Sequence, residues 1–169
     1  EYPGRLYYCK WYNSISKISL IFPATCSMSP SQNILVTVDT LVFTNLSQDQ
    51  LKVLLIKRKN PPFQDQWAIP GGFVENHESL EDGAKRELRE ETGIAVKKLS
   101  QLYTFGDPGR DPRSRVVSVA YWCRVDPNQY PIKAQSDAKQ VQWFEVGHLP
   151  KLAFDHDIII SMALNEFRD

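Results

Sequence analysis

The chain has 169 residues, which is enough for one domain with a sizeable hydrophobic core. Its 20 basic and 20 acidic side chains cancel to a formal net charge of zero. A protein that coats nucleic acid needs a basic excess, so this balance argues against a nucleic-acid partner. The three cysteines, Cys9, Cys26 and Cys123, lack the spacing of a metal or redox motif and are expected to be reduced thiols of a cytoplasmic protein.

Residues 1–32 are rich in Tyr and Ser and show no strong periodicity. The apolar run at residues 18–22 is too short for a signal peptide or a membrane span, so we expect no membrane partner. This N-terminal arm is compatible with extra strands at a sheet edge, an arm exchanged within a dimer, or a linker. A domain of its own is predicted for residues 33–169.

Strand patterns begin early in this domain. Residues 34–43 form a β-branched run and residues 51–57 an apolar run, so both predict strands, with a hairpin turn in the polar stretch 45–50. Residues 67–70 predict a short strand that ends at Pro70 and the two glycines after it.

A polar, glutamate-rich segment of good helix formers follows the glycines. Ser79 can cap its N-terminus, and Gly93 can end it in a left-handed conformation. At about 100° per residue, Leu80, Ala84 and Leu88 form an apolar stripe that is expected to pack on a sheet.

The remainder of the chain alternates strand patterns with loops and ends in a helix. Residues 96–105 and 115–125 predict two strands joined by a loop rich in Gly, Pro, Asp and Arg, and residues 139–145 predict a third. A last helix, capped by the aspartate at its start, is predicted over residues 155–167. Mixed strands with two helices indicate the α/β class, with an α/β/α sandwich around a mixed β-sheet. The apolar face of the last helix consists of Ile158, Ile159, Met162, Ala163 and Phe167.

The segment 72–94 matches the pattern G-x5-E-x7-R-E-U-x-E-E-x-G-U, in which U is apolar, at every defined position. Seven of these positions demand one residue type each, so a chance match is on the order of one in a billion per start point. This pattern is the signature of the Nudix hydrolases, and the chain resembles that family, which implies the Nudix fold for the domain. The defined positions are Gly72, Glu78, Arg86, Glu87, Leu88, Glu90, Glu91, Gly93 and Ile94.

Three carboxylates of the pattern lie on one flank of the predicted helix. Glu87 and Glu91 are four residues apart at the edge of the apolar stripe, and Glu90 lies beside them. Such a cluster is costly unless a cation offsets it, and magnesium takes oxygen ligands while it bridges carboxylates to phosphates. We therefore predict Mg²⁺ or Mn²⁺ at these three residues. The alternative is a solvated charge run paired with Arg86 or Lys85.

The resemblance implies further roles around the metal. A backbone carbonyl of Gly71 or Gly72 would complete the metal shell, and Arg86 would orient the carboxylates by charge-assisted hydrogen bonds. Glu91 is the first choice for the general base that activates water. The alternatives outside the motif are Asp137 and Glu145.

A second resemblance lies in residues 105–122, which read FGDPGRDPRSRVVSVAYW. This stretch is similar to the loop of ADP-ribose pyrophosphatases and of related Nudix domains in NAD metabolism. Pro108 lies fifteen residues beyond Gly93, a spacing associated with the ADP-ribose subgroup. The resemblance implies hydrolysis of ADP-ribose to AMP and ribose 5-phosphate, and by analogy a homodimer with exchanged N-terminal strands.

This loop and several residues outside it supply candidate ligands for the substrate. Arginines can clamp a diphosphate, aspartates can accept hydrogen bonds from ribose hydroxyls, and phenylalanines can stack on adenine. The alternative is core packing for the aromatic rings and internal pairing with Asp107 and Asp111 for the arginines. Arg58 is expected to pair with a phosphate or with Glu90. The candidates are Arg58, Gly72, Phe73, Phe105, Asp107, Arg110, Arg113, Arg115 and Phe154.

Two other functions are compatible with the sequence. One is a non-catalytic ADP-ribose sensor that regulates transcription, which would need a DNA-binding domain that we do not expect in this chain. The other is hydrolysis of a different compound, such as NADH, a dinucleoside polyphosphate, a sugar nucleotide or an oxidised nucleoside triphosphate.

Overall fold

A computed structural model describes residues 33–44, 51–135 and 137–166. The predicted N-terminal arm, residues 1–32, and the predicted hairpin turn at 45–50 lie outside the described residues. Among the described helices, none has the length and apolar character required to cross a membrane. The elements are the strands β1 (Leu35–Thr44), β2 (Lys52–Arg58), β3 (Trp67–Ala68), β4 (Gly71–Phe73), β5 (Ser100–Phe105), β6 (Val116–Val125) and β7 (Ala138–Glu145), and the helices α1 (Leu80–Thr92) and α2 (His156–Glu166).

Strand β1 is the centre of a mixed sheet. It pairs in parallel with β6 along its whole length. On its other side it pairs antiparallel with β4, where Asp39 lies opposite Gly71, and then with β2, where Phe43 lies opposite Val53. The order is β3-β2-β1-β6-β5, and β7 pairs with β2.

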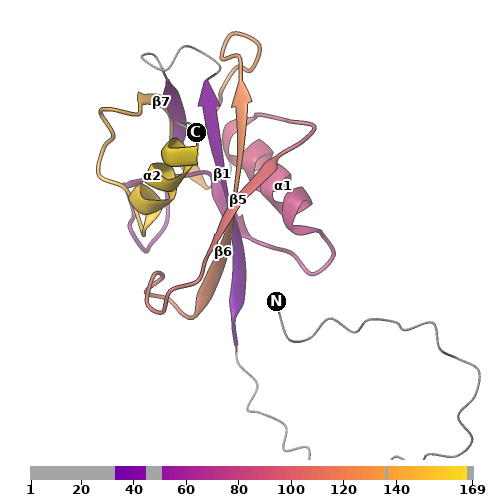
Figure 1. Cartoon of the computed structure of the whole chain (residues 1–169), viewed down its shortest axis with the longest axis vertical. Coiled ribbons are helices and arrows are strands. Elements are labelled where there is room, and N and C mark those ends of the chain that lie inside the picture. Colours follow the sequence, from indigo (N-terminus) through magenta and orange to yellow (C-terminus); the bar gives the residue numbers. More distant parts are fainter. Residues whose placement is uncertain (1–32, 45–50, 136, 167–169) are drawn as a thin grey trace, which may run out of the picture. The chain divides into compact units, whose positions relative to one another are not determined.

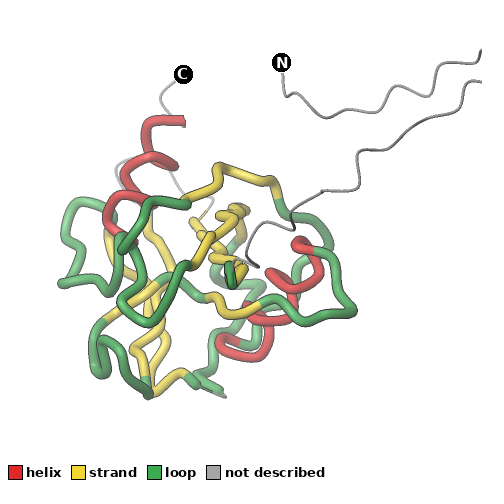
Figure 2. The backbone as a smooth tube through the Cα atoms, turned by 90° about the horizontal axis from the view of Figure 1, so that it is seen from below, coloured by secondary structure: helices red, strands yellow, loops and turns green. Residues whose placement is uncertain are grey.

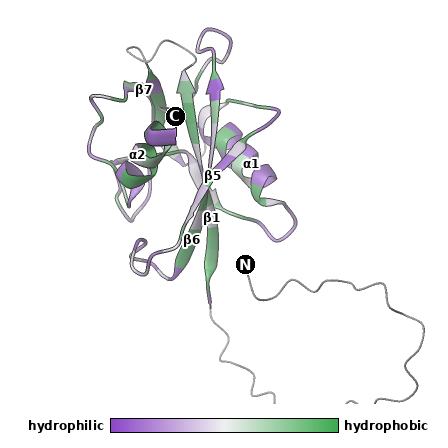
Figure 3. Ribbon diagram, in the orientation of Figure 1, coloured by the Kyte–Doolittle hydropathy of each residue, from purple (hydrophilic) through white to green (hydrophobic). Residues whose placement is uncertain are grey.

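The two helices cover opposite faces of this sheet (Figure 1), and the tube in Figure 2 shows them on separate sides of the strands. Alternate side chains of β1 face the two layers, as expected for a pleated strand buried on both sides. Leu41 and Phe43 belong to the cluster that contains α2, whereas Val38 and Val42 pack in clusters with α1. Figure 3 shows the apolar colour along β1. The predicted α/β/α sandwich with a mixed sheet is confirmed.

Helix α1 begins and ends as its sequence predicts. The Ser79 hydroxyl accepts a hydrogen bond from the Asp82 N–H, and Gly93 adopts a left-handed conformation with φ 79°. Leu88 is fully buried against the sheet, but Leu80 is 37% exposed, so its place in the predicted apolar stripe was wrong. The buried face of α1 starts one turn later than expected.

The segment Gly71–Phe73 was expected to end a strand but forms strand β4. Pairing with β1 is possible because Gly71 has no side chain: a Cβ there would lie 2.8 Å from Asp39 Oδ1 and 2.9 Å from Asp39 Cα. The two glycines therefore allow a third strand to lie close against the centre of the sheet. Strand β5 begins at Ser100, later than residues 96–105 predict.

Helix α2 corrects two expectations. Asp155 does not serve as the predicted side-chain cap, because both carboxylate oxygens accept hydrogen bonds from Arg110, at 2.8 and 2.6 Å. Ile158 is 57% exposed, whereas Ile159 and Ile160 are buried, so the apolar face is rotated by about one residue.

Replacement of Leu88 by Ala is expected to lower the free energy of unfolding by about 2–5 kcal/mol, because it leaves a cavity between α1 and the sheet. The matched change Leu80→Ala should cost about 0.5 kcal/mol or less, since this side chain is largely in solvent. Chemical denaturation of both variants measures the difference. Equal losses would contradict the assignment of the buried face.

Candidate active site

A cavity of about 450 Å³ opens beside the short strand β4. It is lined by side chains of α1, by residues of β1 and the start of α2, and by aromatic and arginine side chains. The cavity thus brings together residues that the sequence predicted for the site and several residues that it did not predict. The lining includes Asp39, Arg58, Lys59, Gly71, Gly72, Phe73, Arg86, Glu87, Glu91, Arg110, Asp111, Arg113, Asp137, Phe154 and His156.

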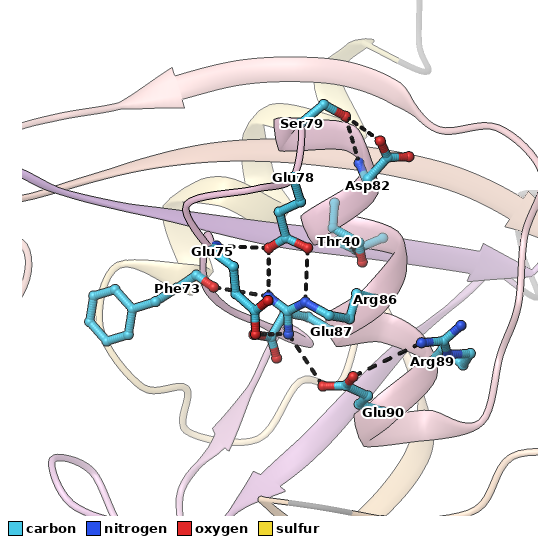
Figure 4. A network of polar contacts seen from close by, with 11 residues as sticks. Thr40, Phe73, Glu75, Glu78, Ser79, Asp82, Arg86, Glu87, Arg89 and Glu90 are labelled. Atoms are coloured by element: carbon cyan, nitrogen blue, oxygen red, sulfur yellow. Dashed lines mark hydrogen bonds and ion pairs between the residues drawn. The ribbon is translucent and has the colours of Figure 1, made fainter.

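Arg86 connects three glutamates of the signature (Figure 4). Its Nε and Nη2 donate to the two oxygens of Glu78, at 2.9 and 2.7 Å, and Nη2 also donates to the Phe73 carbonyl. Its Nη1 donates to Glu87 at 2.8 Å and to Glu90 at 3.2 Å. These five hydrogen bonds use every donor of the guanidinium, and hydrogen bonding to Glu78 is the main cause of its raised pKa. Arg86 therefore orients the carboxylates.

Glu87 lies across the backbone of Gly72. A Cβ on Gly72 would lie 2.5 Å from the Glu87 carboxyl carbon, so only glycine leaves this space free. Burial raises the pKa of Glu87, while Arg86 lowers it. This carboxylate is therefore held in the cavity wall at a cost in hydration.

Glu91 is the most buried carboxylate of the signature, with 5% of its surface exposed. It accepts a hydrogen bond from the Gly71 N–H at 2.9 Å. Burial, reinforced by the charges of Glu87 and Asp39, raises its pKa to about 8. Without a cation, Glu91 therefore keeps its proton at neutral pH, and a bound cation would favour the ionised form.

The cavity floor contains a polar cluster that sequence reasoning missed. Asp39 accepts a hydrogen bond from the Ser118 hydroxyl, and its other oxygen lies 3.7 Å from His156 Nε2. All three side chains are buried. An aspartate within an apolar, β-branched strand was a signal for such a cluster, because a buried carboxylate needs polar partners.

The far wall is a stack of alternating rings and guanidinium groups. Arg113 lies 5.0 Å from the ring centre of Phe73 and 5.5 Å from that of Phe154. Arg58 lies 4.9 Å from the ring centre of Phe154, so this ring contacts both arginines. Arg113 is also paired with the buried Asp111 at 2.6 Å, so an internal salt bridge fixes its direction. Phe73 and Phe154 remain candidates to contact a base.

Several predicted residues lie elsewhere. Phe105 belongs to the hydrophobic core, so packing against the α2 layer replaces the predicted base stacking. Asp107 and Arg115 do not belong to the cavity lining, and Arg115 donates to the Gly106 carbonyl. Arg58 does not pair with Glu90; its Nε donates to the Pro62 carbonyl at 2.9 Å.

The two candidates for the general base outside the signature, Asp137 and Glu145, differ in their distance from the cavity. Asp137 lies at the cavity and accepts a hydrogen bond from the Asn60 amide at 3.4 Å. Glu145 is an exposed residue at the end of β7, where it lies 3.5 Å from His148 and outside the cavity lining. Only Asp137 is placed to reach a ligand in this cavity.

The donor set fits a hard divalent cation that is shared with a ligand. Within residues 33–44, 51–135 and 137–166, no three His, Cys, Asp or Glu side chains already form a metal cage. Glu87 and Glu91 nevertheless line one wall together, and Glu90 lies next to them on Arg86. Magnesium is commonly bound through one or two carboxylates, waters and substrate phosphates, which this wall can supply.

Comparison with known proteins assigns the family. The NUDIX domain family model matches residues 36–162, which is most of the chain. The chain belongs to the Nudix family. The resemblance of the signature segment is therefore confirmed. Of its defined residues, Gly72, Arg86, Glu87 and Glu91 line the cavity.

Relatives of this Nudix domain include proteins of two kinds. An ADP-ribose pyrophosphatase of Methanocaldococcus jannaschii is 48% identical over 110 residues, which cover 65% of this chain and 64% of that protein. An ADPR-responsive transcriptional repressor of Acinetobacter baylyi is 38% identical over 133 residues, 76% of this chain and 52% of the repressor. The chain thus spans less than two thirds of either protein.

One of the similar solved structures has a bound ligand in its name. The NUDIX domain of Shewanella oneidensis NrtR, complexed with ADP ribose, has a TM-score of 0.72 and 36% identity. The match covers 82% of this chain and 90% of that domain. The Nudix fold is therefore established for the described domain.

Replacement of Gly72 by Ala is expected to displace Glu87 and weaken Mn²⁺ binding by about tenfold or more, because the added methyl group takes the space of the carboxylate. Titration of the variant with Mn²⁺ measures the effect. Gly147→Ala is the control, since a Cβ on Gly147 would meet nothing within 4 Å. Unchanged affinity in the Gly72 variant would contradict a role for Glu87 in metal binding.

As the pH rises, the metal-free wild-type protein should become less stable to unfolding than the metal-free Glu91→Gln variant. The folded-state pKa of Glu91 is about 8 against a model value of 4.5, so its stabilising contribution is complete below pH 4.5 and is lost as the pH approaches 8. Melting temperatures measured in a chelator at several pH values should therefore coincide in acid and favour the variant near pH 8. A constant difference across this range would disprove the raised pKa.

Proposed function

We propose that this protein is a divalent-metal-dependent hydrolase of ADP-ribose that releases AMP and ribose 5-phosphate. The supporting observation is a cavity lined by two chemically different groups of side chains, the acidic side chains of α1 and a stack of arginine and phenylalanine side chains. A diphosphate with a cation suits the first group, and a nucleoside suits the second. ADP-ribose contains both parts.

The proposed metal ligands are Glu87, Glu90 and Glu91, with a backbone carbonyl of Gly71 or Gly72. A divalent cation there would neutralise the diphosphate and lower the pKa of a bound water. Arg86 fixes the directions of Glu87 and Glu90 through its hydrogen bonds.

Glu91 is the proposed general base. It is the most buried carboxylate of the signature, and a cation that offsets the neighbouring charges would release its proton. Its carboxylate is then able to accept the proton of the attacking water. Asp137, which also lines the cavity, is the alternative base.

A second candidate is an ADP-ribose sensor without catalysis. It is favoured by the similarity to the Acinetobacter repressor, whose name describes a response to ADPR. The complete set of signature carboxylates in this chain favours the enzyme, because binding alone does not require a general base. The cytoplasmic location, the homodimer and the absence of nucleic-acid partners remain predictions from the sequence.

Purified protein is expected to hydrolyse ADP-ribose with Mg²⁺ and to lose this activity in a chelator. Glu91→Gln should lower kcat by about 10²–10⁴-fold, the usual contribution of a general base, while the variant remains folded. Product release measured for ADP-ribose, NADH, a dinucleoside polyphosphate, a sugar nucleotide and a nucleoside triphosphate tests the substrate. Faster turnover of any other compound would overturn the ADP-ribose assignment, and tight binding without turnover would favour the sensor.

A matched comparison assigns the base. Asp137→Asn changes the alternative base in the cavity lining, and Glu145→Gln changes an exposed carboxylate outside the lining. The Glu145 variant should turn over ADP-ribose at the wild-type rate. A larger loss in the Asp137 variant than in Glu91→Gln would transfer the role of base to Asp137.

A further inference from the structure

The short link between β3 and β4 is held from three sides. The Ile69 N–H donates to His156 Nδ1 at 2.8 Å, which connects the link to α2. The Gly71 N–H donates to Glu91 at 2.9 Å, which connects it to α1. Pro70, between them, accepts a hydrogen bond from the backbone of β1 at 2.8 Å. The backbone next to the proposed metal site is therefore fixed by both helices and the central strand.

The hydrogen bond from Ile69 defines the state of His156. A neutral imidazole has one donor and one acceptor nitrogen, so Nδ1 accepts from Ile69 and Nε2 carries the hydrogen. That N–H faces Asp39, with Nε2 3.7 Å from Oδ1, a favourable contact of a dipole with a carboxylate. Burial lowers the pKa of His156, although the charge of Asp39 opposes this effect. The lowered pKa keeps the ring neutral.

Asp39 is itself fixed beneath the link. The Ser118 hydroxyl donates to its Oδ2. Its backbone lies opposite Gly71 in the pairing of β1 and β4, and its Oδ1 would be 2.8 Å from a Cβ on Gly71. The sequence of contacts thus runs from Ser118 through Asp39 and His156 to the Ile69 N–H.

We propose that His156 is a positioning residue for the metal site. With Asp39 behind its Nε2, it holds the Ile69 N–H and thereby sets the backbone of Gly71 and the carboxylate of Glu91 that Gly71 binds. This inference rests on the proposed metal site. It means that a residue at the start of α2, outside the signature segment, influences metal affinity.

Two substitutions separate positioning from simple packing. Asn at position 156 places its amide oxygen near the position of Nδ1, so it retains an acceptor for Ile69. Gln places its polar group near the position of Nε2 and loses that acceptor. Both remove the imidazole ring, so a purely structural role predicts similar losses for the two variants.

The experiment measures Mn²⁺ affinity without substrate, by electron paramagnetic resonance of the free ion. His156→Gln should weaken Mn²⁺ binding by about tenfold, and His156→Asn by about threefold or less, as for other residues that orient metal ligands indirectly. His148→Gln, which changes a side chain that is 86% exposed, is the control. Wild-type affinity in the His156→Gln variant, or equal losses in both variants, would refute the positioning role.

A second measurement does not depend on whether a His156 variant folds. The chain has three histidines, and nitrogen-15 NMR of the wild-type protein distinguishes their tautomers. The other two signals are assigned by His77→Gln and His148→Gln, which change exposed side chains, and the remaining signal belongs to His156. The expected signal is a neutral ring with hydrogen on Nε2. Hydrogen on Nδ1, or a charged ring at neutral pH, would refute the inference. Failure of the wild-type protein to bind Mn²⁺ would instead refute the metal site, which keeps the two failures distinct.

Discussion

The interaction between Arg86 and three glutamates of the signature is the constraint on which the site depends. Glu78, Glu87 and Glu90 each accept a hydrogen bond from this one guanidinium. Like charges on adjacent turns would otherwise repel one another and turn towards solvent. Because Arg86 uses all its donors, these carboxylates keep fixed directions, whereas Glu91 accepts its hydrogen bond from the Gly71 N–H.

Close backbone approach is the second requirement of the site. Gly71 and Gly72 lie where side chains would collide with Asp39 and Glu87. Their absence of Cβ atoms lets β4 join the sheet and lets α1 lay its carboxylates against the strand. The same two residues therefore serve the fold and the site, which explains why the signature begins with a glycine.

The cavity combines parts from distant regions of the sequence. Its acidic side chains come from α1, and further lining residues come from β1, the first residue of α2, and the loops after β2 and β5 and before α2. Most of the loop arginines are paired internally, Arg110 with Asp155 and Arg113 with Asp111. These salt bridges fix the directions of the arginine side chains in the cavity lining.

The sequence by itself determined the family, the fold class, the cap residues of α1 and the set of carboxylates, because these depend on spacing along one helix and on local conformation. Only the tertiary structure decided that Phe105 lies in the core, that Arg113 joins Phe73 and Phe154, and that Glu145 lies outside the cavity. It also revealed the cluster of Asp39, Ser118 and His156, whose members lie on three separate elements. Spacing within one element follows from helical geometry, whereas contacts between elements depend on sheet order and packing, which no local pattern contains.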